Sequence, residues 1–131
     1  MCEICGCGEK PRVSIDVHAP LLAENDAQAR HLRDHFNASK LLALNLMGSP
    51  GSGKTALIEA VARAVGDRFH LAAVSGDLAT TLDADRLAAA GVASAAITTG
   101  SACHLDAAMV HRAIHLDPFA RAVRACDVLF I

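Results

Sequence analysis

The segment LNLMGSPGSGKTALIEA, residues 44–60, constrains the fold more than any other part of the chain. It joins a nearly continuous apolar run to a G-x-x-x-x-G-K-T motif and then to residues with helical spacing. Unbroken hydrophobicity favours a strand of a parallel sheet that is covered on both faces. In that context the motif is typical of a phosphate-binding loop, or P-loop, so the segment predicts a strand–loop–helix unit.

The same alternation of apolar runs and helical patterns continues to the end of the 131-residue chain. We expect strands over residues 40–47, 70–77, 93–100 and 127–131, and helices over residues 25–39, 56–66, 83–91 and 103–116. Strands that alternate with helices form right-handed βαβ units. The sequence therefore predicts an α/β fold with a parallel, doubly wound sheet of the P-loop NTPase type, with about four strands.

The sequence pattern also predicts a domain organisation for the chain. The predicted segments are a flexible, Cys-rich tail (1–22), an N-terminal helix (23–40) and a P-loop domain (41–131). Functional loops follow the carboxyl ends of strands in such sheets, so a chain that stops at Ile131 is interpreted as a truncated domain.

The net charge of −2 gives no electrostatic reason to expect nucleic acid or membrane as a partner. No signal-like segment is recognised, and we expect a cytoplasmic protein.

The chemistry of a triphosphate accounts for the residue types of the P-loop. Glycines allow backbone N–H groups to turn around phosphate oxygens, and the next helix adds its positive N-terminal end. Lys54 is expected to reach the β- and γ-phosphates, and the Thr55 hydroxyl to coordinate Mg²⁺. The predicted nucleotide-binding residues are Gly48, Ser49, Pro50, Gly51, Ser52, Gly53, Lys54 and Thr55.

Asp77 ends the second predicted strand at the same sheet edge as the P-loop. A carboxylate in this position can hold Mg²⁺ directly or through water, and we count Asp77 with Lys54 and Thr55 as the predicted catalytic residues. An ordinary turn aspartate explains the position equally well.

Cysteines supply the candidate ligands for softer metals. Cys2, Cys5 and Cys7 form a C-x-x-C-x-C group, and thiolates this close in sequence suit zinc, copper(I), iron–sulfur clusters or nickel. A redox dithiol of Cys2 and Cys5, or a chance cluster, are the alternatives. Cys103 and His104 follow the third strand, at the expected start of a helix whose dipole favours the thiolate. Packing together with a helix cap is the competing interpretation of this pair.

Five further residues receive no site. His31/His35 and His111/His115 are pairs spaced four residues apart on predicted helices, and we interpret them as solvated surface side chains. Cys126 is interpreted as small apolar filling.

Taken together, C-x-x-C-G-C, LNLMGSPGSGKT, SGD and TGSACHLDA resemble the HypB family of nickel-incorporation GTPases, over essentially the whole chain. The resemblance implies an N-terminal nickel site at Cys2, Cys5 and Cys7, and a second nickel or zinc site with Cys103 and His104 at a dimer interface. It also implies that Gly51 to Thr55 hold the triphosphate, with Asp77 as a switch carboxylate near Mg²⁺.

The function implied by this resemblance is nickel delivery during [NiFe]-hydrogenase maturation, with GTP binding and hydrolysis controlling metal transfer. The implied cofactors are GTP, Mg²⁺, Ni²⁺ and Zn²⁺. The implied partners are a second copy of the chain, a HypA-type nickel/zinc accessory protein and the hydrogenase large-subunit precursor. The Glu-Asn segment, the Cys-Pro ligand and the guanine-reading N-K-x-D motif follow this last strand in the family, outside residues 1–131. A P-loop ATPase or kinase with structural zinc, and a non-catalytic metal-binding chain, are the alternative functions.

Overall fold

The computed structural model describes residues 19–76, 81–97 and 105–131. In chain order its elements are α1 (Ala19–Ala38), β1 (Leu42–Leu44), α2 (Lys54–Val65), the 3₁₀ turn η1 (Gly66–Arg68), β2 (Leu71–Ser75), α3 (Thr81–Ala89), β3 (Ala93–Ala96), α4 (Ala107–His115), α5 (Phe119–Ala125) and β4 (Val128–Phe130). The alternation of strands and helices follows the sequence prediction.

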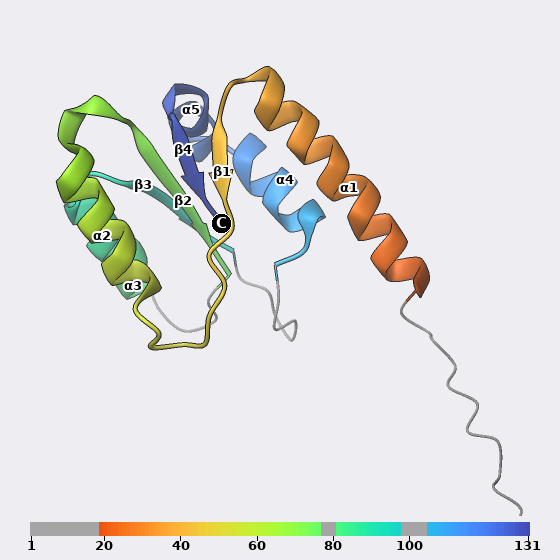
Figure 1. The fold of residues 1–131 in the computed structure, drawn as a ribbon, viewed down its shortest axis with the longest axis horizontal. Helices are drawn as coiled ribbons and strands as arrows, with labels where there is room; N and C mark the ends of the chain where they lie inside the picture. The colour runs from red at the N-terminus through yellow and green to blue at the C-terminus, as the bar shows by residue number, and fades with distance from the viewer. Residues whose placement is uncertain (1–18, 77–80, 98–104) are drawn as a thin grey trace, which may run out of the picture.

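The strands form one parallel sheet in the order β1-β4-β2-β3 (Figure 1). β4, the last strand in sequence, lies between β1 and β2, where Leu129 is the register partner of both Ala43 and Ala72. All three pairings are parallel, so the carboxyl ends of the strands meet at one edge. The predicted parallel α/β fold is confirmed.

Helices cover both faces of the sheet because the buried strand residues alternate between them. On β2, Ala72 and Val74 belong to a core cluster with residues of α1, α4 and α5, whereas Leu71 and Ala73 belong to a second cluster with residues of α2 and α3. Figure 1 shows the same arrangement, with α1 and α4 on one side of the sheet and α2 and α3 on the other. The predicted doubly wound architecture is therefore correct.

On the face of the sheet covered by α1, α4 and α5, all three helices differ from the sequence expectation. α1 begins at Ala19 rather than near Asn25. α5 was not predicted, because it is a seven-residue helix that directly follows Pro118. Its residues Phe119, Ala120 and Val123 are nevertheless buried, so α5 contributes to the core.

The predicted helix over residues 103–116 is wrong at its start, because α4 begins at Ala107. Asp106 is its N-cap, and the Asp106 carboxylate accepts a hydrogen bond from the Met109 N–H at 2.6 Å. The Ala107 N–H donates to the Asn25 side-chain oxygen of α1 at 2.9 Å. These acceptors satisfy first-turn N–H groups and fix the start of the helix. The dipole of α4 therefore starts at Ala107, four residues after Cys103 in the sequence, and gives no support for a thiolate at Cys103.

Among the residues that the structure describes, no helix combines the length and the apolar character needed to cross a lipid bilayer.

Candidate functional site

The P-loop connects β1 to α2 at the carboxyl edge of the sheet (Figure 1). Backbone hydrogen bonds carry the pairing of β1 and β4 beyond the strands themselves. The Ile131 N–H donates to the Leu44 carbonyl at 2.9 Å, and the Leu46 N–H donates to the Ile131 carbonyl at 2.7 Å. The loop therefore starts directly beside the end of β4, one of the two central strands.

The backbone of the loop has the conformation that its glycines permit. Gly51 and Gly53 have φ angles of 79° and 88°, in the left-handed region where a side chain would be strained. Beyond the adjacent residues, no atom lies within 4 Å of the position that a Cβ would take at either residue, and the loop backbone from residue 48 to residue 53 is exposed. Gly53 is also the N-cap of α2 and provides no side-chain acceptor for the first-turn N–H groups. The loop thus fits an anion such as a phosphate group.

Lys54 places a positive charge on this loop. Its ammonium group donates hydrogen bonds to the carbonyl of Gly48 at 2.7 Å and to that of Ser49 at 3.1 Å. The side chain is therefore folded back over the loop rather than extended into solvent. Thr55 follows in the first turn of α2 and is half-buried. The structure brings a cation, open backbone and a hydroxyl-bearing residue together, as the motif indicates.

The ends of β2 and the segment before α4 touch beside this edge. A Cβ at Gly76 would lie 2.5 Å from Leu105 Cγ and 2.8 Å from Leu105 Cδ2, closer than non-bonded atoms approach. A side chain at position 76 would therefore require the Leu105 side chain to move. Gly76 directly precedes Asp77, and Leu105 directly follows His104. The contact therefore joins the two chain segments that carry these predicted site residues.

The remaining predicted site residues lie outside the described ranges 19–76, 81–97 and 105–131. The metal-ligand predictions for these positions, and the catalytic prediction for one of them, stay predictions; the residues are Cys2, Cys5, Cys7, Asp77, Cys103 and His104.

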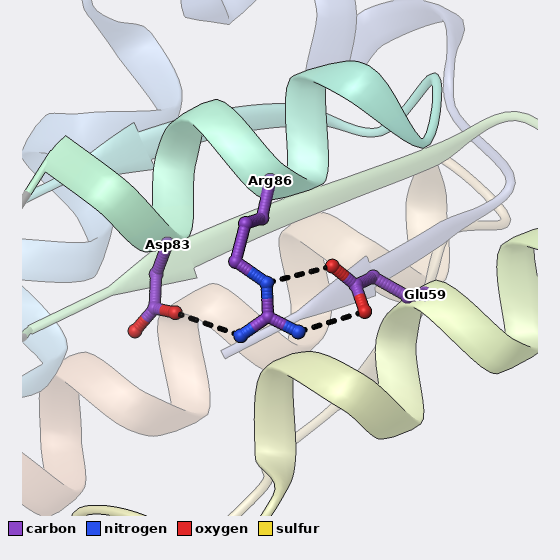
Figure 2. A network of polar contacts seen from close by, with 3 residues as sticks. All are labelled: Glu59, Asp83 and Arg86. Carbon is purple, nitrogen blue, oxygen red and sulfur yellow. Dashed lines mark hydrogen bonds and ion pairs between the residues drawn. The ribbon is translucent and has the colours of Figure 1, made fainter.

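A polar network links α2, which begins at the P-loop, to α3 (Figure 2). The Arg86 guanidinium donates two hydrogen bonds to the Glu59 carboxylate, each 2.9 Å long, and lies 3.8 Å from an oxygen of Asp83. Hydrogen bonding to Glu59, followed by its charge, raises the pKa of Arg86. The network holds α3, the helix that follows residues 77–80, against α2, the helix that begins at the P-loop. Sequence reasoning missed it, because Glu59 and Arg86 are far apart in the chain and carry no motif.

A second group that sequence reasoning set aside comes together between α1 and α4. The ring centres of His31 and His111 are 5.7 Å apart, those of His111 and His115 are 4.5 Å apart, and those of His35 and His115 are 5.3 Å apart. We call these four residues the histidine cluster. Burial, and then the neighbouring imidazoles, lower the pKa of His111 and so favour its neutral form.

Comparison with known proteins agrees with this arrangement. The family of CobW/HypB/UreG nucleotide-binding domains matches residues 42–131. The chain is 45% identical over 101 residues to the hydrogenase/urease maturation factor HypB of Helicobacter hepaticus, covering 77% of this chain and 41% of that protein. It is 45% identical over 113 residues to the hydrogenase maturation factor HypB of Cupriavidus necator, covering 83% and 31%. The chain thus spans less than half the length of these relatives.

Solved structures give the same answer for the fold. The crystal structure of HypB from Helicobacter pylori in complex with nickel superposes with a TM-score of 0.74 at 42% identity, covering 82% of this chain and 49% of that one. HypB from Archaeoglobus fulgidus gives a TM-score of 0.71 at 36% identity, with 83% and 51% covered. Because the family match extends over residues 42–131, well over half of the sequence, the chain belongs to the CobW/HypB/UreG nucleotide-binding domain family.

Proposed function

We propose that this chain is part of a nickel carrier for hydrogenase maturation whose hold on the metal is controlled by GTP. The observation that carries the proposal is the P-loop itself, with its open glycine backbone and the Lys54 ammonium lying on it. Support for the metal comes from the relatives, which include HypB maturation factors and a HypB structure in complex with nickel.

The proposed nucleotide site uses the loop from Gly48 to Thr55. The backbone N–H groups of the loop and of the first turn of α2 would bind phosphate oxygens, and Lys54 would exchange its carbonyl partners for the β- and γ-phosphates. The Thr55 hydroxyl, together with the Asp77 carboxylate, would hold Mg²⁺. Mg²⁺ supplies charge neutralisation for GTP hydrolysis, while the chain's own residues position the triphosphate.

The contact between Gly76 and Leu105 gives this site a physical connection to the proposed metal ligands. Asp77, which directly follows Gly76 in the chain, would respond to Mg²⁺ and nucleotide. Leu105, which directly follows His104 in the chain, packs closely against Gly76. Through this contact, a displacement of one segment would act on the other. Coupling between two such sites typically changes affinity by roughly 5–150-fold.

The proposed metal positions follow the family resemblance. Cys2, Cys5 and Cys7 would form an N-terminal nickel site. Cys103 and His104 would contribute to a nickel or zinc site completed by a second copy of the chain. We further propose a HypA-type accessory protein and the hydrogenase large-subunit precursor as partners in the cytoplasm.

A nucleotide titration with matched variants tests the first part of the proposal. Fluorescent GTP analogues would be titrated into the wild-type chain and into the Lys54→Ala, Thr55→Ala and Thr55→Ser variants, with and without Mg²⁺. Losing a charged hydrogen-bond donor to phosphate should weaken binding by about tenfold or more in Lys54→Ala. Thr55→Ser retains the hydroxyl and should keep the Mg²⁺ dependence that Thr55→Ala loses.

Two results would contradict this proposal. Equal binding by the wild-type chain and Lys54→Ala would show that the loop does not hold the phosphates. Displacement of the analogue by ATP at lower concentration than by GTP would instead support a P-loop ATPase or kinase.

A further inference from the structure

The histidine cluster is built by the matched register of two helices. His31 and His35 are one turn apart on α1, and His111 and His115 are one turn apart on α4. The packing of α1 on α4 places His31 beside His111 and His35 beside His115. Below them, Leu32 and Phe36 of α1 are buried in the same core cluster as residues of α4, so the interface that sets this register is part of the core.

The ring spacing suits a shared metal ion. Two imidazoles on one tetrahedral ion have ring centres about 5 Å apart, because each metal–nitrogen bond is ~2.0–2.1 Å long. The central pair, His111 and His115, lies at 4.5 Å, and each member has a neighbour on α1 at 5.7 or 5.3 Å. The central pair can therefore be joined by imidazoles from the other helix.

One ring already has the hydrogen bond that a metal-ligating histidine normally makes. His115 Nδ1 lies 2.8 Å from the His111 carbonyl oxygen. A carbonyl can only accept, so Nδ1 carries the proton, and in the neutral ring Nε2 then has a free lone pair. A backbone carbonyl in this role fixes the tautomer and orientation of a metal ligand. Nε2 is therefore the nitrogen of His115 that is available to a metal ion.

The cluster is accessible, and its outer rings would have to rotate to meet on one ion. His31, His35 and His115 are exposed, and His111 is half-buried. As the side chains stand, no three His, Cys, Asp or Glu residues within the described ranges converge on a single point. Exposed side chains change rotamer easily on the nanosecond scale, so rotation of the outer rings onto a bound ion meets little resistance.

We propose that the histidine cluster is a binding site for a divalent transition-metal ion that bridges α1 and α4. All-imidazole sites favour Zn²⁺, Ni²⁺ and Cu²⁺ over Mg²⁺ and Ca²⁺. The site contains no cysteine and lies apart from the P-loop. It goes beyond the proposed function and does not depend on nucleotide binding.

The test measures metal binding by the full-length chain with Cys2, Cys5, Cys7 and Cys103 replaced by serine, which removes the competing thiolates. Isothermal titration with Ni²⁺ and with Zn²⁺ would compare this chain with three further variants in the same background: His111→Gln/His115→Gln, His31→Gln/His35→Gln, and the control His70→Gln. His70 lies outside the cluster and near Asp127. We expect one ion to bind to the parent and to the control, with at least tenfold weaker binding in both cluster variants.

Thermal unfolding gives a second readout that separates metal binding from misfolding. Added Ni²⁺ should raise the Tm of the parent and of His70→Gln, since a ligand that binds only the folded state stabilises it. The two cluster variants should fold with similar metal-free Tm values and show no such rise. Equal Ni²⁺ affinity in the parent and in His111→Gln/His115→Gln would overturn the site. Unchanged affinity in His31→Gln/His35→Gln would overturn the bridge between helices.

Discussion

The substitution Gly76→Ala examines the contact that connects the two proposed sites. The new Cβ would lie 2.5 Å from Leu105 Cγ, 2.8 Å from Cδ2 and 3.2 Å from Cδ1. Favourable carbon–carbon contacts begin near 3.5 Å, so Leu105 has to retreat by about 1 Å. Overpacking of this kind costs about 1–3 kcal/mol. The smaller entropy of the unfolded alanine chain offsets about 0.4–1 kcal/mol of that cost.

A double-mutant cycle isolates this steric term. Urea unfolding would be measured for the wild-type chain, Gly76→Ala, Leu105→Ala and the double variant. Leu105 is half-buried, so its truncation alone should cost about 1–2 kcal/mol. In the double variant the clash is absent, and its free energy of unfolding should exceed that of Leu105→Ala by the entropic gain of about 0.4–1 kcal/mol. The expected coupling energy is about 1–3 kcal/mol.

The double-mutant cycle also tests whether the Gly76–Leu105 contact can connect the proposed nucleotide and metal sites. Strictly additive free energies would refute the close contact between the end of β2 and the segment before α4. If the contact transmits nucleotide binding to the metal ligands, Leu105→Ala should also reduce the effect of Mg²⁺–GTP on nickel affinity, while leaving nucleotide affinity nearly unchanged.

Three further predictions concern the framework around the site. Arg86→Met should lower the Tm slightly by removing the pair with Glu59, and the difference from wild type should shrink at high salt, because exposed charges are screened. Leu129→Ala, at a fully buried position, should cost about 2–5 kcal/mol in urea unfolding. Leu42→Ala, at a side chain that is 54% exposed, should cost far less. Burial, and then the charge of Asp127, raise the pKa of Cys126 from 9.0 to about 11. In a chain whose other cysteines are serine, this thiol should react slowly with disulfide reagents at pH 8 until the chain is unfolded. Stability should fall as the pH rises from 9 towards 11, because the unfolded thiol ionises first. Native and unfolded thiols that react equally fast, or the same pH dependence in Cys126→Ala, would contradict the cysteine prediction.

The sequence predicts those parts of the fold whose hydrophobic pattern or motif lies within one continuous segment. The apolar run and glycine loop of residues 44–60 predict the P-loop unit, and the alternation of strands with helices predicts the parallel sheet. The placement of β4 between β1 and β2 depends on pairing between residues far apart in the chain, which no local pattern contains. α5 is too short and too close to Pro118 to give a helical pattern, although Phe119 is buried.

The candidate site likewise has features that a local motif predicts and features that depend on contacts between distant segments. Lys54 and the loop glycines are set by a motif, and the structure places the Lys54 ammonium on the loop as the motif indicates. The start of α4 was mispredicted, because the Asp106 cap was overlooked in a helical-looking run. Each histidine pair alone has the pattern of a solvated surface, and three of the four side chains are indeed exposed. Only the packing of α1 against α4 reveals that the pairs share one register.

The most direct test of the central claim is the nickel affinity of the full-length chain, measured by competition with a chromophoric chelator, with and without Mg²⁺ and a non-hydrolysable GTP analogue. The account predicts that the analogue changes the nickel affinity by at least about fivefold in the wild-type chain and leaves it unchanged in Lys54→Ala. A nickel affinity that is the same with and without the analogue in the wild-type chain, under conditions where the analogue is bound, would contradict the account.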